Sequence, residues 1–345
     1  MCSKWICCLG AVIGIVCCEY QTRQLTAKEP PDNQEKWLFL LDQVRSHSEQ
    51  FKAGECTITG RAYSPQRSEK TILMDHKFVI RLAFVRPLKC RWEGYIPAWV
   101  NDPAQAGVDE NNNPTAGLKF GELTVLYATN GPDAAWWDSD HGVWINLLPR
   151  PTAEARLDQT LYFPDIAYLT LYTSLERKQK APPDEMINVL KKQKNVSIDD
   201  SGPIWKARWI IPVKVAAQKI DIIVVMEVDT ENGFRVTKLA YIVRRPGGKE
   251  TVQEQLTAKW QHRNGAYVPI HYTTQLGFKE EGSNYITTEA DIAWSSVNVS
   301  LADSLFEWGS FKVPSGTGVL DARGRNPTFV MVQPELEDRC VRVSG

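Results

Sequence analysis

Histidines and catalytic motifs are scarce in this sequence. The five histidines are scattered along the chain and show no H-x-x-H spacing: His47, His76, His141, His262 and His271. No G-x-S-x-G nucleophile motif is present, and Gly316-Thr317-Gly318 lacks the third glycine of a nucleotide-binding loop. These absences remove the usual residue sets of a hydrolase, a metal site and a nucleotide site. We therefore expect a non-enzymatic protein with no cofactor and no metal.

An excess of one charge is missing as well. The net charge is −1, which gives no general affinity for nucleic acid.

The apolar segment Trp5–Val16 follows Lys4 and is too short to span a bilayer. We interpret residues 1–18 as an export signal peptide and residues 19–33 as a polar linker, with no transmembrane span in the mature chain.

Cysteine says little about the mature fold, because five of the eight lie inside the predicted signal. Ile15-Val16-Cys17-Cys18 has the outline of a lipobox but lacks the small residue that precedes an acylated cysteine. Lipid tethering through Cys17 or Cys18 is therefore not our main expectation. Cys56, Cys90 and Cys340 remain; one disulfide can form among them in an oxidising compartment, but the sequence does not pair them.

Aromatic residues, by contrast, are abundant, with 12 Trp, 11 Tyr and 11 Phe in 345 residues. They suit a wide apolar cavity or a thick β core equally well. The stretch Phe78–Arg86 has the period of two that places alternate residues on one sheet face. That apolar face consists of Phe78, Ile80, Leu82 and Phe84.

Arg86 continues the same register and stands before Pro87, which ends strand pairing. A guanidinium at the end of an apolar row is costly to bury without acceptors for its protons. Arg86 is thus either an arginine at the rim of the sheet or a functional residue.

The second half of the chain reads as consecutive hairpins. Two strand faces alternate clearly, one carrying Trp205 and Trp209 and the other Ile220 and Val224. Turn sequences separate the strands at Glu231-Asn232-Gly233, Pro246-Gly247-Gly248, Asn264-Gly265 and Glu281-Gly282. Such hairpins build one large, curved antiparallel sheet.

Helical segments flank and interrupt the strands. Helical spacing of Trp37, Leu40, Leu41, Val44 and Phe51 predicts an amphipathic helix that ends near Gly54, with Asp32 or Asn33 as its N-cap. Two further helices are predicted within residues 163–193. Residues 101–117 are rich in Asn, Asp, Pro and Gly and predict an exposed loop. The fold class is therefore α+β rather than βαβ.

Three motifs, taken in order, resemble the bacterial outer-membrane lipoprotein carrier and sorting family, which is LolA/LolB-like. The first is Arg86-Pro87-x-Lys89-x-Arg91-Trp92, and the second is Ala128-Thr129-Asn130-Gly131 followed by Ala135-Trp136-Trp137-Asp138. The third joins Leu305-Phe306 to the run Val313–Asp321. The loop at 101–117 and the long C-terminal tail depart from the family pattern.

The resemblance implies an incomplete, half-open β-barrel with helices as a lid, formed by a single domain over residues 34–325 before a tail at 326–345. It also implies an apolar cavity that shields lipid anchors. We assign its lining to Phe78, Ile80, Leu82, Phe84, Trp205, Trp209, Ile220 and Val224. In the resembling family the arginine before the proline contacts helix carbonyls and holds the lid closed, which makes Arg86 the predicted lid switch.

The resulting expectation is an exported, non-enzymatic carrier in the periplasm. Its partners would be lipid-anchored proteins or acyl lipids, together with inner-membrane release machinery and an outer-membrane acceptor. One alternative is an envelope sensor or structural module that binds a protein or another lipid through the same fold. Another is a hydrolase in which Asp138 and Asp140 act as a carboxylate pair, although both residues suit a turn better.

Overall fold

The computed structural model describes residues 31–63, 75–86, 89–101, 107–108, 114–115, 118–140, 142–149, 187–188, 190–215, 218–277, 286–324 and 327–330. The predicted signal peptide, most of the polar linker, most of the predicted helices at 163–193 and most of the tail lie outside these ranges. None of the helices within the ranges has the length and apolar character needed to cross a membrane.

The described chain is one long helix followed by many strands. The helix, α2, covers Pro31–Glu49. The first strands are β1 (Ala53–Tyr63), β2 (Asp75–Val85), β3 (Lys89–Asn101), β4 (Gly107–Val108), β5 (Pro114–Thr115), β6 (Leu118–Asn130), β7 (Asp133–Asp138) and β8 (Trp144–Pro149). The later strands are β9 (Ser197–Asp199), β10 (Ile204–Val215), β11 (Gln218–Asp229), β12 (Arg235–Arg244), β13 (Glu250–Arg263), β14 (Ala266–Leu276), β15 (Ile286–Val297), β16 (Gly318–Asp321) and β17 (Thr328–Val330). Two 3₁₀ turns, η4 (Asp303–Phe306) and η5 (Trp308–Ser310), precede β16.

Hydrogen bonding joins fifteen of these strands in one sheet, in the order β17-β16-β8-β7-β6-β3-β2-β1-β15-β14-β13-β12-β11-β10-β9. The order begins with β17 and ends with β9, and these two strands are the edges of the described sheet, which is therefore open rather than closed. The pairings within it are antiparallel except for β8 with β16, which are parallel. The prediction of a large, unclosed antiparallel sheet with helical cover is confirmed.

The chain divides into two compact units. Unit 1 is formed by Met1–Phe51, Ala62–Asp75 and Pro164–Ala290, and unit 2 by Lys52–Arg61, His76–Phe163 and Asp291–Gly345. The single-domain boundaries drawn from the sequence stay a prediction.

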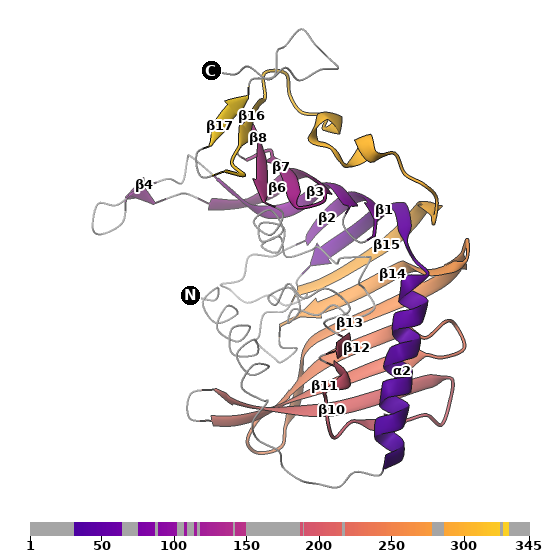
Figure 1. Cartoon of the computed structure of the whole chain (residues 1–345). Helices are drawn as coiled ribbons and strands as arrows, with labels where there is room; N and C mark the ends of the chain where they lie inside the picture. Colours follow the sequence, from indigo (N-terminus) through magenta and orange to yellow (C-terminus); the bar gives the residue numbers. More distant parts are fainter. Residues whose placement is uncertain are drawn as a thin grey trace. The chain divides into compact units, whose positions relative to one another are not determined.

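In unit 1 the strands β10 to β14 follow one another as hairpins, and α2 runs across them (Figure 1). β10 and β11 pair over their whole length, from Ile204 with Asp229 to Val215 with Gln218. The β13–β14 hairpin turns at Asn264-Gly265, where both residues have positive φ as a tight turn between twisted strands requires. The predicted turns at Glu231-Asn232-Gly233, Pro246-Gly247-Gly248 and Asn264-Gly265 each lie between two paired strands, whereas Glu281-Gly282 lies outside the described residues.

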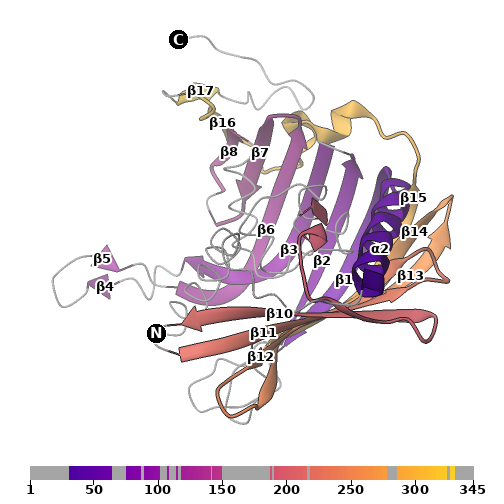
Figure 2. The ribbon, with the colours of Figure 1, turned by 60° about the horizontal axis from the view of Figure 1, so that its bottom comes forward.

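In unit 2, Figure 2 shows β2, β3, β6 and β7 side by side. β3 pairs with β6 along all of its residues, from Lys89 with Asn130 to Asn101 with Leu118. This long pairing carries β3 to the beginning of the segment that the sequence assigned to a loop. Within that segment the short strands β4 and β5 pair with each other, so part of 101–117 is a small hairpin.

The start of α2 differs from the prediction. The helix begins at Pro31, so Asp32 and Asn33 lie inside it rather than capping it. Proline is favoured in the first helical turn because its missing N–H has no partner there and its φ is already helical. The N-cap prediction was wrong for that reason.

Candidate functional site

The apolar face of unit 1 is covered by α2. Trp37, Leu40, Leu41 and Val44 on one side of the helix are completely buried, as the predicted spacing requires. They pack on Trp209 from β10, where the Trp37 and Trp209 ring centroids are 5.4 Å apart. The buried sheet residues of this cluster are Ala207, Trp209, Val213, Ile222, Val224, Met226, Val228, Val236 and Leu239.

Polar contacts that fix α2 along its length are few. The Trp37 Nε1–H donates to the carbonyl of Leu190 at 2.9 Å. Two ion pairs, Lys36 with Asp200 at 2.9 Å and Lys191 with Asp42 at 2.5 Å, lie at part-exposed positions. Exposed pairs of this kind contribute about 0–1 kcal/mol each. Apolar burial therefore holds most of the helix in place.

The C-terminal end of α2 rests on a buried arginine. Arg235, at the start of β12, is 1% exposed and donates from its guanidinium to the carbonyl of His47 at 2.5 Å. Its guanidinium carbon lies 5.4 Å from the Trp260 ring centroid and 5.9 Å from that of Tyr267. Carbonyls of a last helical turn lack intrahelical partners and attract positive charge. Arg235 thus anchors this helix end.

The turn before Arg235 is strained. Phe234 has a φ of 50°, which is uncommon for a bulky residue, and Gly233 before it has a φ of 76°. Asp229 holds the turn through its carboxylate, which accepts from the backbone N–H groups of Glu231 and Asn232. The strained backbone directs the Phe234 ring onto α2. We call the set Phe234, Arg235, His47, Trp260 and Tyr267 the α2 clasp.

The Phe234 ring contacts two residues of the helix. It stacks on His47 with ring centroids 5.6 Å apart, and it meets Phe39 edge-on at 5.9 Å. Burial and the neighbouring Arg235 charge lower the pKa of His47, and a hydrogen bond that the ring donates to Gln50 opposes that shift only in part. The clasp therefore favours a neutral imidazole.

Unit 2 has an apolar face that carries a row of aromatic side chains. Leu82 pairs with Trp92, Trp92 with Tyr127, and Tyr127 with Trp136, across the four strands β2, β3, β6 and β7. All four side chains are buried. Directly opposed residues of neighbouring strands present their side chains on the same face, so these four form one continuous row.

Two features shape this row. Gly94 leaves room for the Trp92 indole, because a Cβ at Gly94 would lie 2.7 Å from a carbon of that ring. At the other end Asp138 is buried on the same face and accepts a hydrogen bond from the Trp136 Nε1–H at 2.8 Å. Asp138 thus has a structural partner in the Trp136 indole.

The opposite face of β6, β7 and β8 is covered by the segment that contains η4 and η5. Phe311 packs there against Leu126, Trp137 and Val319. Arg91 on β3 fixes the segment, because its guanidinium donates to the carbonyls of Leu305 and Ser310, each at 3.2 Å, and to the Ser310 hydroxyl. Arg91 therefore anchors this segment to β3.

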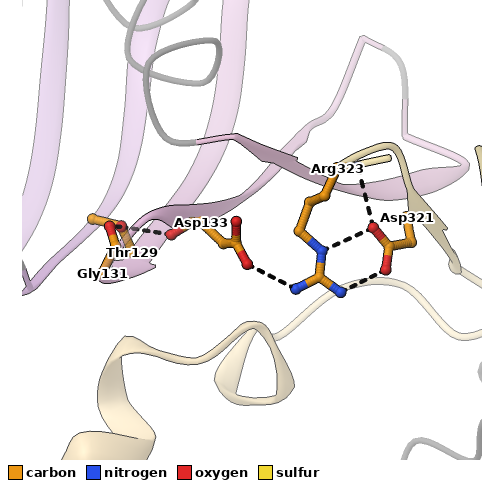
Figure 3. A network of polar contacts seen from close by, with 5 residues as sticks. All are labelled: Thr129, Gly131, Asp133, Asp321 and Arg323. Atoms are coloured by element: carbon orange, nitrogen blue, oxygen red, sulfur yellow. Dashed lines mark hydrogen bonds and ion pairs between the residues drawn. The ribbon is translucent and has the colours of Figure 1, made fainter. Parts of the chain in front are cut away.

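Strand β16 is tied to the β6–β7 hairpin by a small polar network (Figure 3). The Arg323 guanidinium lies between two carboxylates, donating to Asp133 at 3.0 Å and to Asp321 at 2.5 and 2.8 Å. The Asp133 carbonyl accepts from the Thr129 hydroxyl at 2.7 Å. These groups are partly exposed and satisfy one another, so the network is a structural fastening.

The predicted lining residues fall into two sets. Phe78, Ile80, Leu82 and Phe84 are buried on one face of β2 in unit 2, where the period of two placed them. Trp209 and Val224 are buried under α2 in unit 1, with Trp205 and Ile220 partly buried beside them. Each set shares a face within its own unit. That either set binds lipid stays a prediction.

Arg86 lies in unit 2 just after β2, which ends at Val85. Its backbone N–H donates to the Lys52 carbonyl at 2.8 Å. Its role as a lid switch stays a prediction. A contact between an arginine and a helix carbonyl is observed at Arg235, which the sequence analysis missed. In the sequence, the only sign of a buried Arg235 is its position between two apolar residues, Phe234 and Val236, immediately after a turn.

Comparisons with known proteins complete the description. No protein-family model matches the chain, and no curated protein matches it. Among solved structures, it is similar to a putative outer membrane lipoprotein-sorting protein domain from Vibrio parahaemolyticus, with a TM-score of 0.34 and 10% identity over 80% of this chain and 97% of that one. It is also similar to a DUF1329 family protein from Desulfovibrio piger, with a TM-score of 0.32 and 11% identity over 81% of this chain and 99% of that one. At these TM-scores the similarity carries no inference about function.

Proposed function

We propose that this protein is an exported, non-enzymatic carrier that shields acyl chains, such as the lipid anchors of lipoproteins, against its apolar sheet faces. The observation that carries the proposal is the cover of unit 1, where α2 packs on an apolar face of an open sheet together with Ile187, Leu190 and Val196. Its partners would be lipid-anchored proteins or acyl lipids. Release machinery in the inner membrane and an acceptor at the outer membrane would complete the route through the periplasm.

The physical requirement for such a carrier is an apolar surface that can exchange one cover for another. Each CH₂ group of an acyl chain costs about 0.8 kcal/mol when it is exposed to water. The face beneath α2 is lined by Trp209, Val224 and their neighbours, and contact with α2 already hides it from water. An acyl chain that replaced the helix would bury the same side chains.

The polar attachments of α2 are compatible with that exchange. Besides apolar packing, the polar contacts between α2 and the other described residues include the indole bond of Trp37, two part-exposed ion pairs and the Arg235 bond at its end. Hydrogen bonds to a charged group contribute about 1.5–3 kcal/mol, a size that acyl burial can offset. Arg86 stays the proposed lid switch, and Arg86→Leu should impair transfer of the ligand to an acceptor.

The test is equilibrium binding of a fluorescent palmitoyl probe to the purified full chain. Trp209→Asp and Ile80→Asp place a charge on the buried faces of β10 and β2, and we expect each to weaken probe binding at least about tenfold. Ile210→Asp and Val79→Asp are the matched controls, because these neighbours are 44% and 42% exposed on the opposite faces. They should bind like the wild type.

Trp209→Leu and Leu82→Ala keep the experiment informative if the charged variants fail to fold, since both change the shape of a face without adding charge. Circular dichroism identifies the folded variants. The proposal is overturned if the wild-type protein takes up no probe. It is equally overturned if folded variants of the buried faces bind as well as the two controls.

A further inference from the structure

We propose that the α2 clasp is acid-sensitive, so that protonation of His47 releases the C-terminal end of α2 from β12. This inference rests on the proposed function in one respect only, namely that the released helix uncovers a face that binds acyl chains. The clasp itself stands on contacts within unit 1.

His47 contacts two consecutive residues, Phe234 and Arg235, one through its ring and the other through its backbone carbonyl. Its carbonyl accepts the hydrogen bond of Arg235, and its ring stacks on Phe234, the residue next to Arg235. The Nδ1 atom of the ring is buried. A proton added to this ring creates a second positive charge beside a guanidinium that is itself 1% exposed. The two like charges repel each other, and this repulsion is one cause of the lowered pKa of His47.

The described groups that face the clasp from neighbouring elements are aromatic rings, a histidine and an ion-paired carboxylate. From β13 and β14, Trp260 and Tyr267 present aromatic rings to Arg235, and His262 lies beyond Tyr267 at 5.1 Å between ring centroids. On α2 itself, Glu49 is paired with Arg45 at 2.9 Å. Within the described ranges, no carboxylate forms an ion pair with His47.

Two effects favour the protonated ring, and neither dominates. Gln50 forms a hydrogen bond that stabilises the charged imidazole, and the end of a helix attracts positive charge. Burial and Arg235 outweigh them, so the pKa of His47 in the clasped state lies below its ordinary value of 6.5. In the released state the ring is solvated and returns to its ordinary value.

The direction of the pH response follows from this difference. The released state binds a proton more readily, so the clasp is strongest above pH 6.5. It weakens as the pH falls from 6.5 through the lowered pKa of the clasped state and changes no further below that value. Each pKa unit of difference multiplies the released population by about ten at low pH.

The strained turn supports release as well. A bulky residue with positive φ is strained and keeps that conformation only where the surroundings hold it in place. On α2, Phe234 packs against the rings of His47 and Phe39. Once His47 withdraws, this packing is lost, and the turn can relax. Release of the helix end and relaxation of Phe234 therefore favour each other.

The experiment is amide hydrogen exchange of the full chain at pH 7.5 and pH 5.5, corrected for the intrinsic exchange rate at each pH. Peptides from Lys36–Glu49 report on α2, and peptides from Ile222–Val228 of β11 report on the sheet. In the wild type, acid should lower the protection of the C-terminal half of α2 severalfold while the β11 peptides keep theirs. His47→Gln stays neutral and should abolish the acid effect.

His262→Gln is the matched control, because this histidine is exposed and lies behind Tyr267. It should keep the wild-type response. The inference is overturned if α2 is equally protected at both pH values, or if His47→Gln responds to acid like the wild type. Probe binding at pH 7.5 separates the two proposals: retained binding without an acid response refutes only the clasp, whereas an acid response without binding refutes only the carrier.

Discussion

Arg235 is the residue on which the position of the α2 end depends most directly. Replacing it with Met keeps much of the apolar stem but removes the charged donor to the His47 carbonyl. We expect Arg235→Met to lower the free energy of α2 opening by about 1.5–3 kcal/mol, the contribution of a hydrogen bond to a charged group. Hydrogen exchange of α2 amides at neutral pH measures this free energy.

Arg244→Met is the control for that change. Arg244 belongs to the same strand, but it forms part-exposed ion pairs with Asp221 and Glu250 at 3.8 and 3.2 Å. Such pairs contribute about 0–1 kcal/mol, so α2 should exchange almost as in the wild type. Equal protection of α2 in both variants would show that Arg235 does not anchor the helix.

A second prediction at the residue scale concerns the turn that leads into the clasp. Gly233 and Gly248 both have positive φ, at 76° and 84°, so alanine is strained at either position. Only at Gly233 would the added Cβ meet another residue, a carbon of the Tyr267 ring at 2.5 Å. Gly233→Ala should therefore cost about 1–3 kcal/mol more than Gly248→Ala in urea unfolding. Equal losses would mean that Tyr267 is free to move aside.

At the scale of elements, the segment with η4 and η5 depends on Arg91 of β3. Arg91→Leu removes the donor to the Leu305 and Ser310 carbonyls, and we expect local unfolding of Asp303–Ser310 to become easier by about 1.5–3 kcal/mol. Limited proteolysis in this segment measures the change.

Lys89→Gln is the matched variant, because Lys89 lies on the same strand and reaches the same segment through an ion pair with Asp303 at 2.5 Å. Asp303 is 69% exposed, so this pair should matter little. If both variants are cleaved at the wild-type rate, the segment is held by the apolar contacts of Phe311 rather than by Arg91.

The elements show which features can be read from a sequence. The period of two predicted the buried faces of β2, β10 and β11, since burial on one face of a strand repeats every second residue. Helical spacing likewise predicted the buried side of α2. The clasp could not be predicted in this way, because Arg235 and His47 are 188 residues apart and a single buried arginine has no period.

The contact at the end of α2 shows the complementary limit. A motif can single out a residue, but no local pattern says which residue reaches the end of this helix. That contact is made by Arg235, whose position depends on a strained turn and on the packing of β13 and β14 around it. Tertiary packing, which a local pattern does not contain, decides such contacts.

At the scale of the whole molecule, the central claim is that the apolar sheet faces hold acyl chains. The most direct measurement is native mass spectrometry of the protein purified from the envelope of a double-membraned bacterium, followed by denaturation and identification of any released lipid. The carrier function predicts a chain that begins after the export signal and carries an acyl ligand that is lost on unfolding. A ligand-free protein that also fails to take up a palmitoyl probe would contradict it.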